Sequence, residues 1–400
     1  MIRKTIKTYL WILSGYEFGH SFMFTTYVLF LVGNGLNLLE ANLVNLYFMV
    51  AVFLFEIPTG AYADTLGRKR SFVLGCLATG LGFMVYFFSH NFWQFVAAEL
   101  VLALAASLIS GAFDAWLISS INYYGFNGDL KKVFGHKMWV SKAASATGSL
   151  IGACLGSYNL AWPWLGGSLI LVVVSIIAGV VMKEEYFVAT KHSGIIGRLK
   201  QIKSVAVDSV HYGLKEKMIL LLMVLSITLS FSVQPLNMYW SVYFEKLLHG
   251  KEYLGIIWFV MAIFTLGGGL FSSLVMPRWI KKTSTALLVS YLITALGIIF
   301  AAGLGPYWVI ITFFMVHEIG RGMIDPVTKA YLHDQLPEQK RATIDSFQNM
   351  IKRIGSATGL WLFGTLAQNF GIPLSWFWAG IALLIISPLT MFLKEKRGQN

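Results

Sequence analysis

Apolar stretches of about twenty residues recur along the whole chain and are separated by short polar segments. A helix needs roughly 20 mostly apolar residues to cross the hydrocarbon core of a bilayer. The pattern therefore predicts twelve membrane-spanning helices, and a longer polar segment from about residue 183 to 217 divides them into two sets of six. The predicted centres are Phe18, Val52, Phe83, Ala105, Ser149, Val173, Ile227, Val260, Leu292, Val316, Thr358 and Leu383.

The two sets of helices carry traces of an internal repeat. Ser145-Ala146-Thr147-Gly148 recurs 211 residues later as Ser356-Ala357-Thr358-Gly359, and Gly111–Asp114 matches Gly322–Asp325 at the same offset. Transporters built from two related halves show this kind of symmetry. We expect an all-α membrane protein with two pseudo-symmetric six-helix bundles, residues 1–183 and 217–400, joined by a cytoplasmic linker, residues 184–216.

Composition and charge exclude several classes of protein. Hydrophobic residues make up 56% of the chain and charged residues 12%, whereas soluble domains carry roughly 25% charged residues. With both termini inside the cell, 24 of the 31 Lys and Arg residues fall on the cytoplasmic side, and only Lys246 and Lys251 fall outside. The net charge of +12 therefore indicates membrane topology and not a nucleic-acid partner. We expect a multi-pass protein of the bacterial inner membrane with cytoplasmic termini.

A short loop between the second and third predicted helices carries a specific motif. It reads Gly60-Ala61-Tyr62-Ala63-Asp64-Thr65-Leu66-Gly67-Arg68-Lys69-Arg70. This resembles the signature loop of the major facilitator superfamily, and the resemblance implies a secondary transporter that works by alternating access. It also implies a latch between the bundles formed by Gly60, Asp64, Gly67, Arg68, Lys69 and their partners. Two further segments, Phe55–Thr59 and Arg341–Thr343, resemble those of bacterial exporters in the superfamily.

The residues of this loop suit a latch on physical grounds as well. Gly60 permits close approach of a neighbouring helix, and Gly67 permits a tight turn. Asp64 lies within ion-pair reach of Arg68, and its carboxylate can also face the positive N-terminus of another helix. The alternative is an ordinary cytoplasmic loop whose basic residues serve topology alone.

Charged and ionisable residues inside a bilayer are costly and mark functional sites by default. Glu17 lies near the middle of the first helix with His20 on the same face, and we expect this pair to bind a proton or the substrate. A carboxylate in a low-dielectric cavity holds a proton more readily than in water. By family resemblance the first, fourth, seventh and tenth helices line the cavity. The other candidates on these helices are Asp114, Gln234, His317, Glu318, Arg321 and Asp325.

Depth in the membrane predicts two ion pairs, Asp114 with Lys142 and Asp325 with Arg353, as gates near the inner mouth. The alternative is that both are static packing pairs, which only offset the cost of placing charges inside the membrane. Gln234-Pro235 is expected to interrupt the seventh helix. Glu99 is expected at the membrane interface near the outer end of the fourth helix.

We expect proton-coupled efflux of a small organic solute, in the manner of drug/proton antiporters. One alternative is proton-coupled transport of a polar or anionic metabolite bound by Arg321, and another is a non-transporting receptor or lipid-handling protein on the same fold. No nucleotide-binding loop, catalytic constellation or metal-ligand cluster is present in the sequence, so we expect no enzyme, no cofactor and no metal. The expected partners are the solute, protons and membrane lipids, and the expected state is a monomer.

Overall fold

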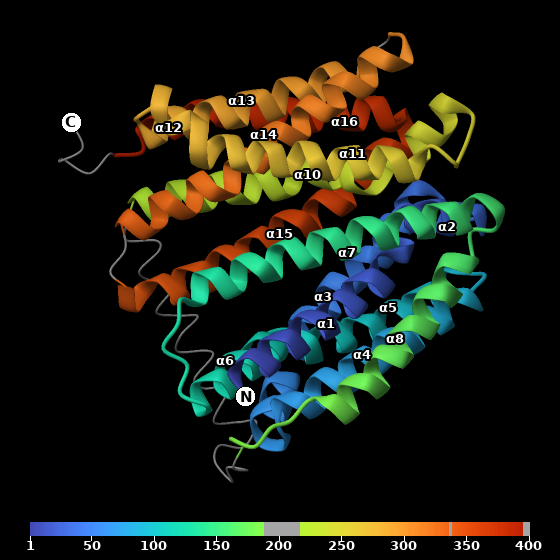
Figure 1. Cartoon of the computed structure of the whole chain (residues 1–400). Helices are drawn as coiled ribbons and strands as arrows, with labels where there is room; N and C mark the ends of the chain where they lie inside the picture. Colours follow the sequence, from blue (N-terminus) through green and yellow to red (C-terminus); the bar gives the residue numbers. More distant parts are fainter. Residues whose placement is uncertain (188–216, 304, 336–337, 395–400) are drawn as a thin grey trace. The chain divides into compact units, whose positions relative to one another are not determined.

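The computed structural model describes residues 1–187, 217–303, 305–335 and 338–394, and throughout these ranges the regular elements are helices (Figure 1). The chain divides into two compact units. The first comprises residues 1–36, 44–201 and 250–258, and the second comprises residues 37–43, 202–249 and 259–400. The predicted linker, 184–216, lies outside the described residues except at its start, 184–187.

Most of the first unit is formed by the helices that precede residue 187. Their bounds are α1 (Ile2–His20), α2 (Tyr27–Gly33), α3 (Leu38–Leu66), α4 (Arg68–Phe87), α5 (Phe92–Ile109), α6 (Ala112–Tyr123), α7 (Leu130–Tyr158) and α8 (Trp162–Val181). The helices after residue 217 are α10 (Lys217–Leu248), α11 (Leu254–Leu270), α12 (Met276–Trp279), α13 (Thr283–Ala301), α14 (Tyr307–Gln335), α15 (Glu338–Phe370) and α16 (Ile372–Ile386).

Each of the twelve predicted centres lies within one of these helices. Within the described residues, eight helical segments are long and apolar enough to cross a membrane. The predicted first, fifth, tenth and eleventh spans fall outside that set. These four spans carry most of the embedded polar candidates, so the segments with the weakest hydrophobic signal are also those of functional interest.

Three spans are broken at places that the sequence did not indicate. A 3-10 turn, Ser21–Met23, separates α1 from α2, and a π-helix, Phe271–Val275, separates α11 from α12. Gly111 adopts a left-handed conformation (φ +72°) between α5 and α6, which glycine does at little steric cost. The predicted interruption at Gln234-Pro235 is wrong, because α10 continues through Pro235 as one helix. The carbonyl of Pro235 instead accepts a hydrogen bond from Trp376.

The repeat is visible in how equivalent helices pack inside each unit. In the first unit α7 packs on α1, and in the second unit α15 packs on α10. A Cβ at Gly148 would overlap the carbonyl oxygen of Phe18, and a Cβ at Gly359 would approach the carbonyl oxygen of Phe231 to 2.5 Å. These two glycines end the matching Ser-Ala-Thr-Gly segments, so the repeated residues occupy the same place in each helix pair.

Candidate functional site

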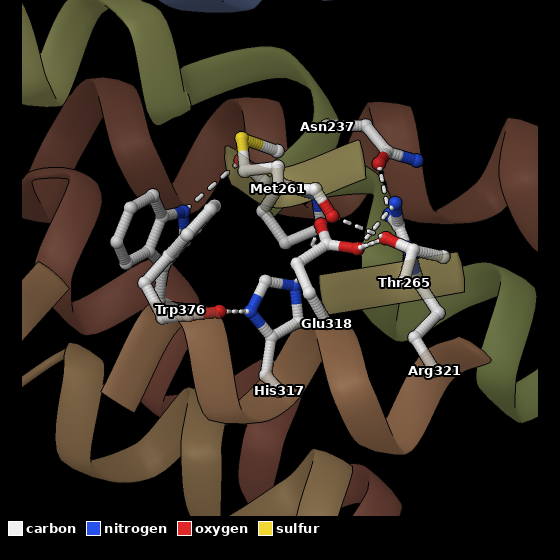
Figure 2. Close-up of polar contacts among 9 residues, drawn as sticks. Asn237, Met261, Thr265, His317, Glu318, Arg321 and Trp376 are labelled. Carbon is white, nitrogen blue, oxygen red and sulfur yellow. Dashed lines mark hydrogen bonds and ion pairs between the residues drawn. The ribbon is translucent and has the colours of Figure 1, made fainter. Parts of the chain in front are cut away.

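A fully buried carboxylate, Glu318, lies in the middle of α14. Its Oε2 accepts hydrogen bonds from Thr265 Oγ1 on α11, at 2.6 Å, and from Arg321 Nη2, at 2.8 Å. Figure 2 shows Glu318 between these two groups and the imidazole ring of His317. The other oxygen, Oε1, lies 3.5 Å from His317 Nε2, and neither atom has a hydrogen-bond partner among the described residues. Such unsatisfied buried groups are rare and frequently functional.

The hydrogen bond on the other side of the imidazole fixes its tautomer. Nδ1 of His317 bonds to the carbonyl oxygen of Phe314, and because a carbonyl oxygen only accepts, Nδ1 carries a hydrogen. In the neutral ring Nε2 is then an acceptor, and it faces the acceptor Oε1 of Glu318. Two buried acceptors at this distance repel each other unless a proton is bound to one of them. The geometry of the His317–Glu318 pair therefore accommodates one proton.

Arg321 extends from Glu318 toward α10. Its Nη1 donates to Oδ1 of Asn237 at 2.7 Å, and its side chain is 27% exposed. A guanidinium has five N–H donors, so these bonds leave donors for a further acceptor. Arg321 is accordingly the member of this cluster that is accessible to a bound polar or anionic group.

Two glycines explain how α11 brings Thr265 to Glu318. A Cβ at Gly322 would overlap the carbonyl oxygen of Thr265, and a Cβ at Gly268 would overlap that of Ile319. The absence of side chains at these positions allows the backbones of α11 and α14 to come close. The hydroxyl of Thr265 then reaches the buried carboxylate directly.

The first unit has a second polar cluster, between α1, α6 and α7. Asp114 lies in the first turn of α6, directly after the break at Gly111. Its carboxylate accepts hydrogen bonds from Tyr9, at 2.5 Å, and from Lys137, at 2.6 Å. The predicted pair with Lys142 is therefore wrong. Lys137 precedes Lys142 by five residues on α7, which places it about 7.5 Å further along the helix axis.

Glu17 and His20 have separate surroundings. The carboxyl group of Glu17 interacts with the Ser141 hydroxyl and with the charge of Lys142 on α7. The ring of His20 instead stacks on Tyr16 and Phe83, with ring centroids 5.4 and 5.9 Å away. Among the described residues no ion pair joins Glu17 to His20, so the roles expected of this pair remain a prediction.

The second unit also contains an ion pair, but with a different partner from the one expected. Lys352 Nζ lies 3.1 Å from Oδ1 of Asp325, whose side chain is 61% exposed. The expected pairing of Asp325 with Arg353 is wrong by one position, because Asp325 pairs with Lys352. Consecutive residues point about 100° apart around a helix, so Lys352 and not Arg353 faces this carboxylate. Gln234 is buried within α10.

If the Asp325–Lys352 pair is part of the gate, transport is expected to require opposite charges at these two positions, whichever of them carries the negative one. The single variant Asp325→Lys should cut transport, and the double variant Asp325→Lys/Lys352→Asp should recover it. Stability should change little, because a pair with one largely exposed partner, here Asp325 at 61%, contributes only about 0–1 kcal/mol. Transport rate and thermal unfolding of the purified variants measure the two effects. The combination Asp325→Lys/Arg353→Asp is the matched control and should not recover transport.

The signature loop is held by residues inside the first unit. Gly67 has φ +102° and precedes α4, as expected for a tight turn. Glu184 accepts hydrogen bonds from the backbone N–H groups of Arg68, at 2.7 Å, and Lys69, at 3.2 Å, and so caps α4. Arg68 donates to Ser119 and to the carbonyl of Ala115, both on α6. The loop therefore joins α4, α6 and the chain after α8.

The surroundings of Gly60 and Tyr186 complete the description of this loop. A Cβ at Gly60 would meet nothing within 4 Å, and the close helix approach expected at Gly60 stays a prediction. Tyr186 donates to Glu184 at 3.1 Å. Burial, together with the negative charge of Glu184, raises the pKa of the Tyr186 hydroxyl, which therefore stays protonated as a donor. The role of Asp64 in a latch stays a prediction.

Glu99, whose expected depth at the membrane interface remains a prediction, lies inside the first unit. Its side chain is only 4% exposed, and the hydroxyl groups of Tyr27 and Tyr86 both donate to it. Trp164, whose ring packs against both tyrosines, is also fully buried. Contacts of this kind depend on three helices meeting, which a single sequence does not reveal.

Comparisons with known proteins agree on one family. The model of the Major Facilitator Superfamily matches residues 10–316 and 259–400. A protein of Bacillus subtilis (strain 168), the uncharacterized MFS-type transporter YxaM, is 23% identical over 385 residues, which cover 92% of this chain and 90% of that protein. The crystal structure of nucleoside transporter NupG matches with a TM-score of 0.78 and 14% identity, covering 98% of this chain and 100% of that one. The D-xylose-proton symporter matches with a TM-score of 0.71 and 12% identity over 99% of both chains.

Proposed function

Because the chain belongs to the Major Facilitator Superfamily, whose model covers almost all of it, we propose that it couples the movement of a small organic solute to that of protons. The chain is a multi-pass membrane transporter, and its relatives are transporters rather than enzymes.

The observation that carries proton coupling is the geometry of His317 and Glu318. Two acceptor atoms that are buried and otherwise unpartnered face each other at 3.5 Å. Such an arrangement is stable with one bound proton and costly without it. The same carboxylate bonds to Arg321 through its second oxygen. Loading or release of the proton therefore changes the net charge beside Arg321, which couples proton binding to binding of a polar solute.

We propose export in exchange for protons as the direction. The support is the resemblance of Phe55–Thr59 and Arg341–Thr343 to the corresponding segments of bacterial exporters. In this cycle a proton reaches the His317–Glu318 pair from outside while the solute leaves, and the proton departs inside before the next solute binds. The protein acts in the inner membrane as a monomer, with both termini in the cytoplasm.

The second candidate is transport of an anionic or polar metabolite, and it is favoured by Arg321. Its guanidinium is partly exposed and retains unused donors. A carboxylate or phosphate is the ligand that a guanidinium binds best, because the two groups form paired hydrogen bonds. A neutral or cationic solute would leave these donors without such a partner.

Reconstitution into liposomes tests the proposal. An imposed pH gradient is expected to drive ethidium, a lipophilic cation, out of the compartment that corresponds to the cytoplasm. Uridine, D-xylose and benzoate complete the panel, as a nucleoside, a sugar and an organic anion. Gradient-driven movement of benzoate alone, beyond its passive movement in protein-free liposomes, would replace efflux of lipophilic compounds by the second candidate. Movement of none of the four under any gradient would contradict coupled transport and favour a receptor on this fold.

The predicted latch gives a separate test of alternating access. Asp64→Asn removes one charge at the end of α3 and is expected to cut transport at least tenfold, about 1.4 kcal/mol, while folding is retained. Thermal unfolding and transport rate are measured on the same preparation. Asp129→Asn, also on the predicted cytoplasmic side, is the control. Wild-type transport by Asp64→Asn would exclude the latch.

A further inference from the structure

A carboxyl group that the proposed cycle does not use lies inside the first unit. Glu99, on α5, has a side chain that is almost wholly buried. Oε1 accepts a hydrogen bond from Tyr27 Oη on α2, at 2.7 Å, and another from Tyr86 Oη on α4, at 2.5 Å. Three helices therefore meet at one oxygen atom of one carboxyl group.

Aromatic rings enclose most of this group. Tyr86 has no exposed surface and stacks on Trp164 of α8, with ring centroids 3.9 Å apart and the planes 6° from parallel. Tyr27 also packs against Trp164, and Phe95 packs against Tyr86. From α3, the side chain of Asn45 interacts with the Tyr27 hydroxyl. Besides the ring faces, the described surroundings contain the two phenol groups, the amide of Asn45 and the indole N–H of Trp164, which has no hydrogen-bond partner among the described residues.

Within the part of the chain that the structure describes, no positive charge pairs with Glu99. The titratable groups that face it are Tyr27, from α2, and Tyr86, from α4. Among the described residues no Lys, Arg or His forms an ion pair with it, whereas Asp114, Glu318 and Asp325 each have one. A buried carboxylate without a cation is strongly disfavoured. The neutral acid removes that cost.

The hydrogen-bond pattern fits the neutral acid. Both phenol groups donate to Oε1, and no donor among the described residues bonds to Oε2. A protonated carboxyl group has one carbonyl oxygen, which accepts two hydrogen bonds, and one hydroxyl oxygen. Assigning Oε1 as the carbonyl and Oε2 as the hydroxyl satisfies both tyrosines without a buried charge.

We propose that Glu99 is a second proton-binding site, which holds its proton while Tyr27 and Tyr86 bond to it and gives it to water when they separate. The O–H bond at Oε2 breaks, the electron pair stays on the carboxylate, and the proton passes to a water molecule. This inference rests on the proposed proton coupling and adds a site in the other unit from His317 and Glu318.

The break in the first span supplies the movement that this release needs. Tyr27 is the first residue of α2, which is separated from α1 by the turn at Ser21–Met23 and the residues after it. A short helix of seven residues on such a joint can change its angle without disturbing α1. Movement of α2 removes one donor from Glu99 and opens its aromatic enclosure, which favours the hydrated carboxylate.

The protonation state is tested by infrared spectroscopy of the purified full chain, without any solute. The difference between wild type and Glu99→Gln is expected to show the carbonyl stretch of a protonated carboxyl group at neutral pH. Tyr86→Phe should move this band to higher wavenumber, because a carbonyl that loses a hydrogen bond stiffens. Glu252→Gln, which alters an exposed glutamate between α10 and α11, is the control and should leave the band unchanged. Absence of the band overturns the proposal.

The carrying role is tested by counting protons moved per solute in liposomes, with whichever of ethidium, uridine, D-xylose and benzoate the wild type transports. Glu99→Gln is expected to move one proton fewer than wild type and Glu252→Gln the same number. An unchanged count in Glu99→Gln overturns the proposal even if the band is present, since Glu99 is then a static neutral acid. If the wild type itself moves no proton, the proposed coupling fails, and the carrying role of Glu99 fails with it. A normal count in wild type and an unchanged count in Glu99→Gln removes this inference alone.

Discussion

Glu318→Gln is expected to abolish transport driven by a pH gradient while leaving exchange of solute for solute intact. Glutamine has nearly the same shape, and its amide oxygen still accepts from Thr265 and Arg321. Glutamine cannot release a proton, so the site formed with His317 is fixed in a state that resembles the protonated one. The gradient-driven rate should fall by about a hundredfold or more, the usual loss when a positioned proton-transfer group is removed.

Both activities are measured in liposomes that contain the same amount of protein, with labelled solute on both sides for exchange. Glu318→Asp keeps an ionisable group and should retain part of the gradient-driven rate, whereas Glu252→Gln should behave as wild type. Full gradient-driven transport by Glu318→Gln would remove Glu318 from the coupling mechanism. Loss of exchange as well as driven transport would mean that Glu318 binds the solute rather than the coupling proton.

Gly152→Ala is expected to prevent correct assembly of the first unit. A Cβ at this position would overlap the backbone carbonyl of Phe22, in the 3-10 turn between α1 and α2. Neither backbone can rotate out of the way as a flexible side chain would. Overpacking usually costs about 1–3 kcal/mol, and a clash with backbone lies at or above the upper end of that range. The yield of folded protein and the temperature of unfolding should both fall.

The same helix offers a matched control. At Gly135, also on α7, a Cβ would meet nothing within 4 Å. Gly135→Ala should therefore keep or slightly raise stability, by up to about 1 kcal/mol, because alanine favours a helix over glycine. The comparison is made by thermal unfolding of the two variants purified side by side. Equal stability of Gly152→Ala and wild type would show that the 3-10 turn Ser21–Met23 and α7 are not packed as described.

The sequence predicted the features that depend on residue type along one helix. Lengths of apolar sequence located the helices, because the hydrocarbon core demands a run of that length. The repeated Ser-Ala-Thr-Gly segments identified equivalent positions in two helix pairs, and Gly148 and Gly359 lie there against neighbouring backbones. The candidates on α14 were identified because ionisable residues inside a bilayer are costly, and the structure brings three of them together, His317, Glu318 and Arg321.

The features that depend on the meeting of several helices could not be predicted in this way. The partner of Asp114 is set by the break at Gly111, which determines where α6 begins relative to α7. The partner of Asp325 was displaced by one residue, because depth in the membrane does not determine which face of α15 is turned toward α14. The two hydrogen bonds to Glu99 could not be predicted either, because their donors come from two other helices, with Tyr27 seventy-two residues away in sequence.

The most direct test of coupled transport reverses the driving force. Wild-type protein is reconstituted into liposomes that hold a trapped pH-sensitive dye, and a gradient of the transported solute is imposed with no initial difference in pH. If export of solute is exchanged for protons, solute leaving the liposomes must bring protons in, so the interior acidifies and Glu318→Gln shows no change. A wild-type interior that stays at constant pH while solute moves would contradict the account.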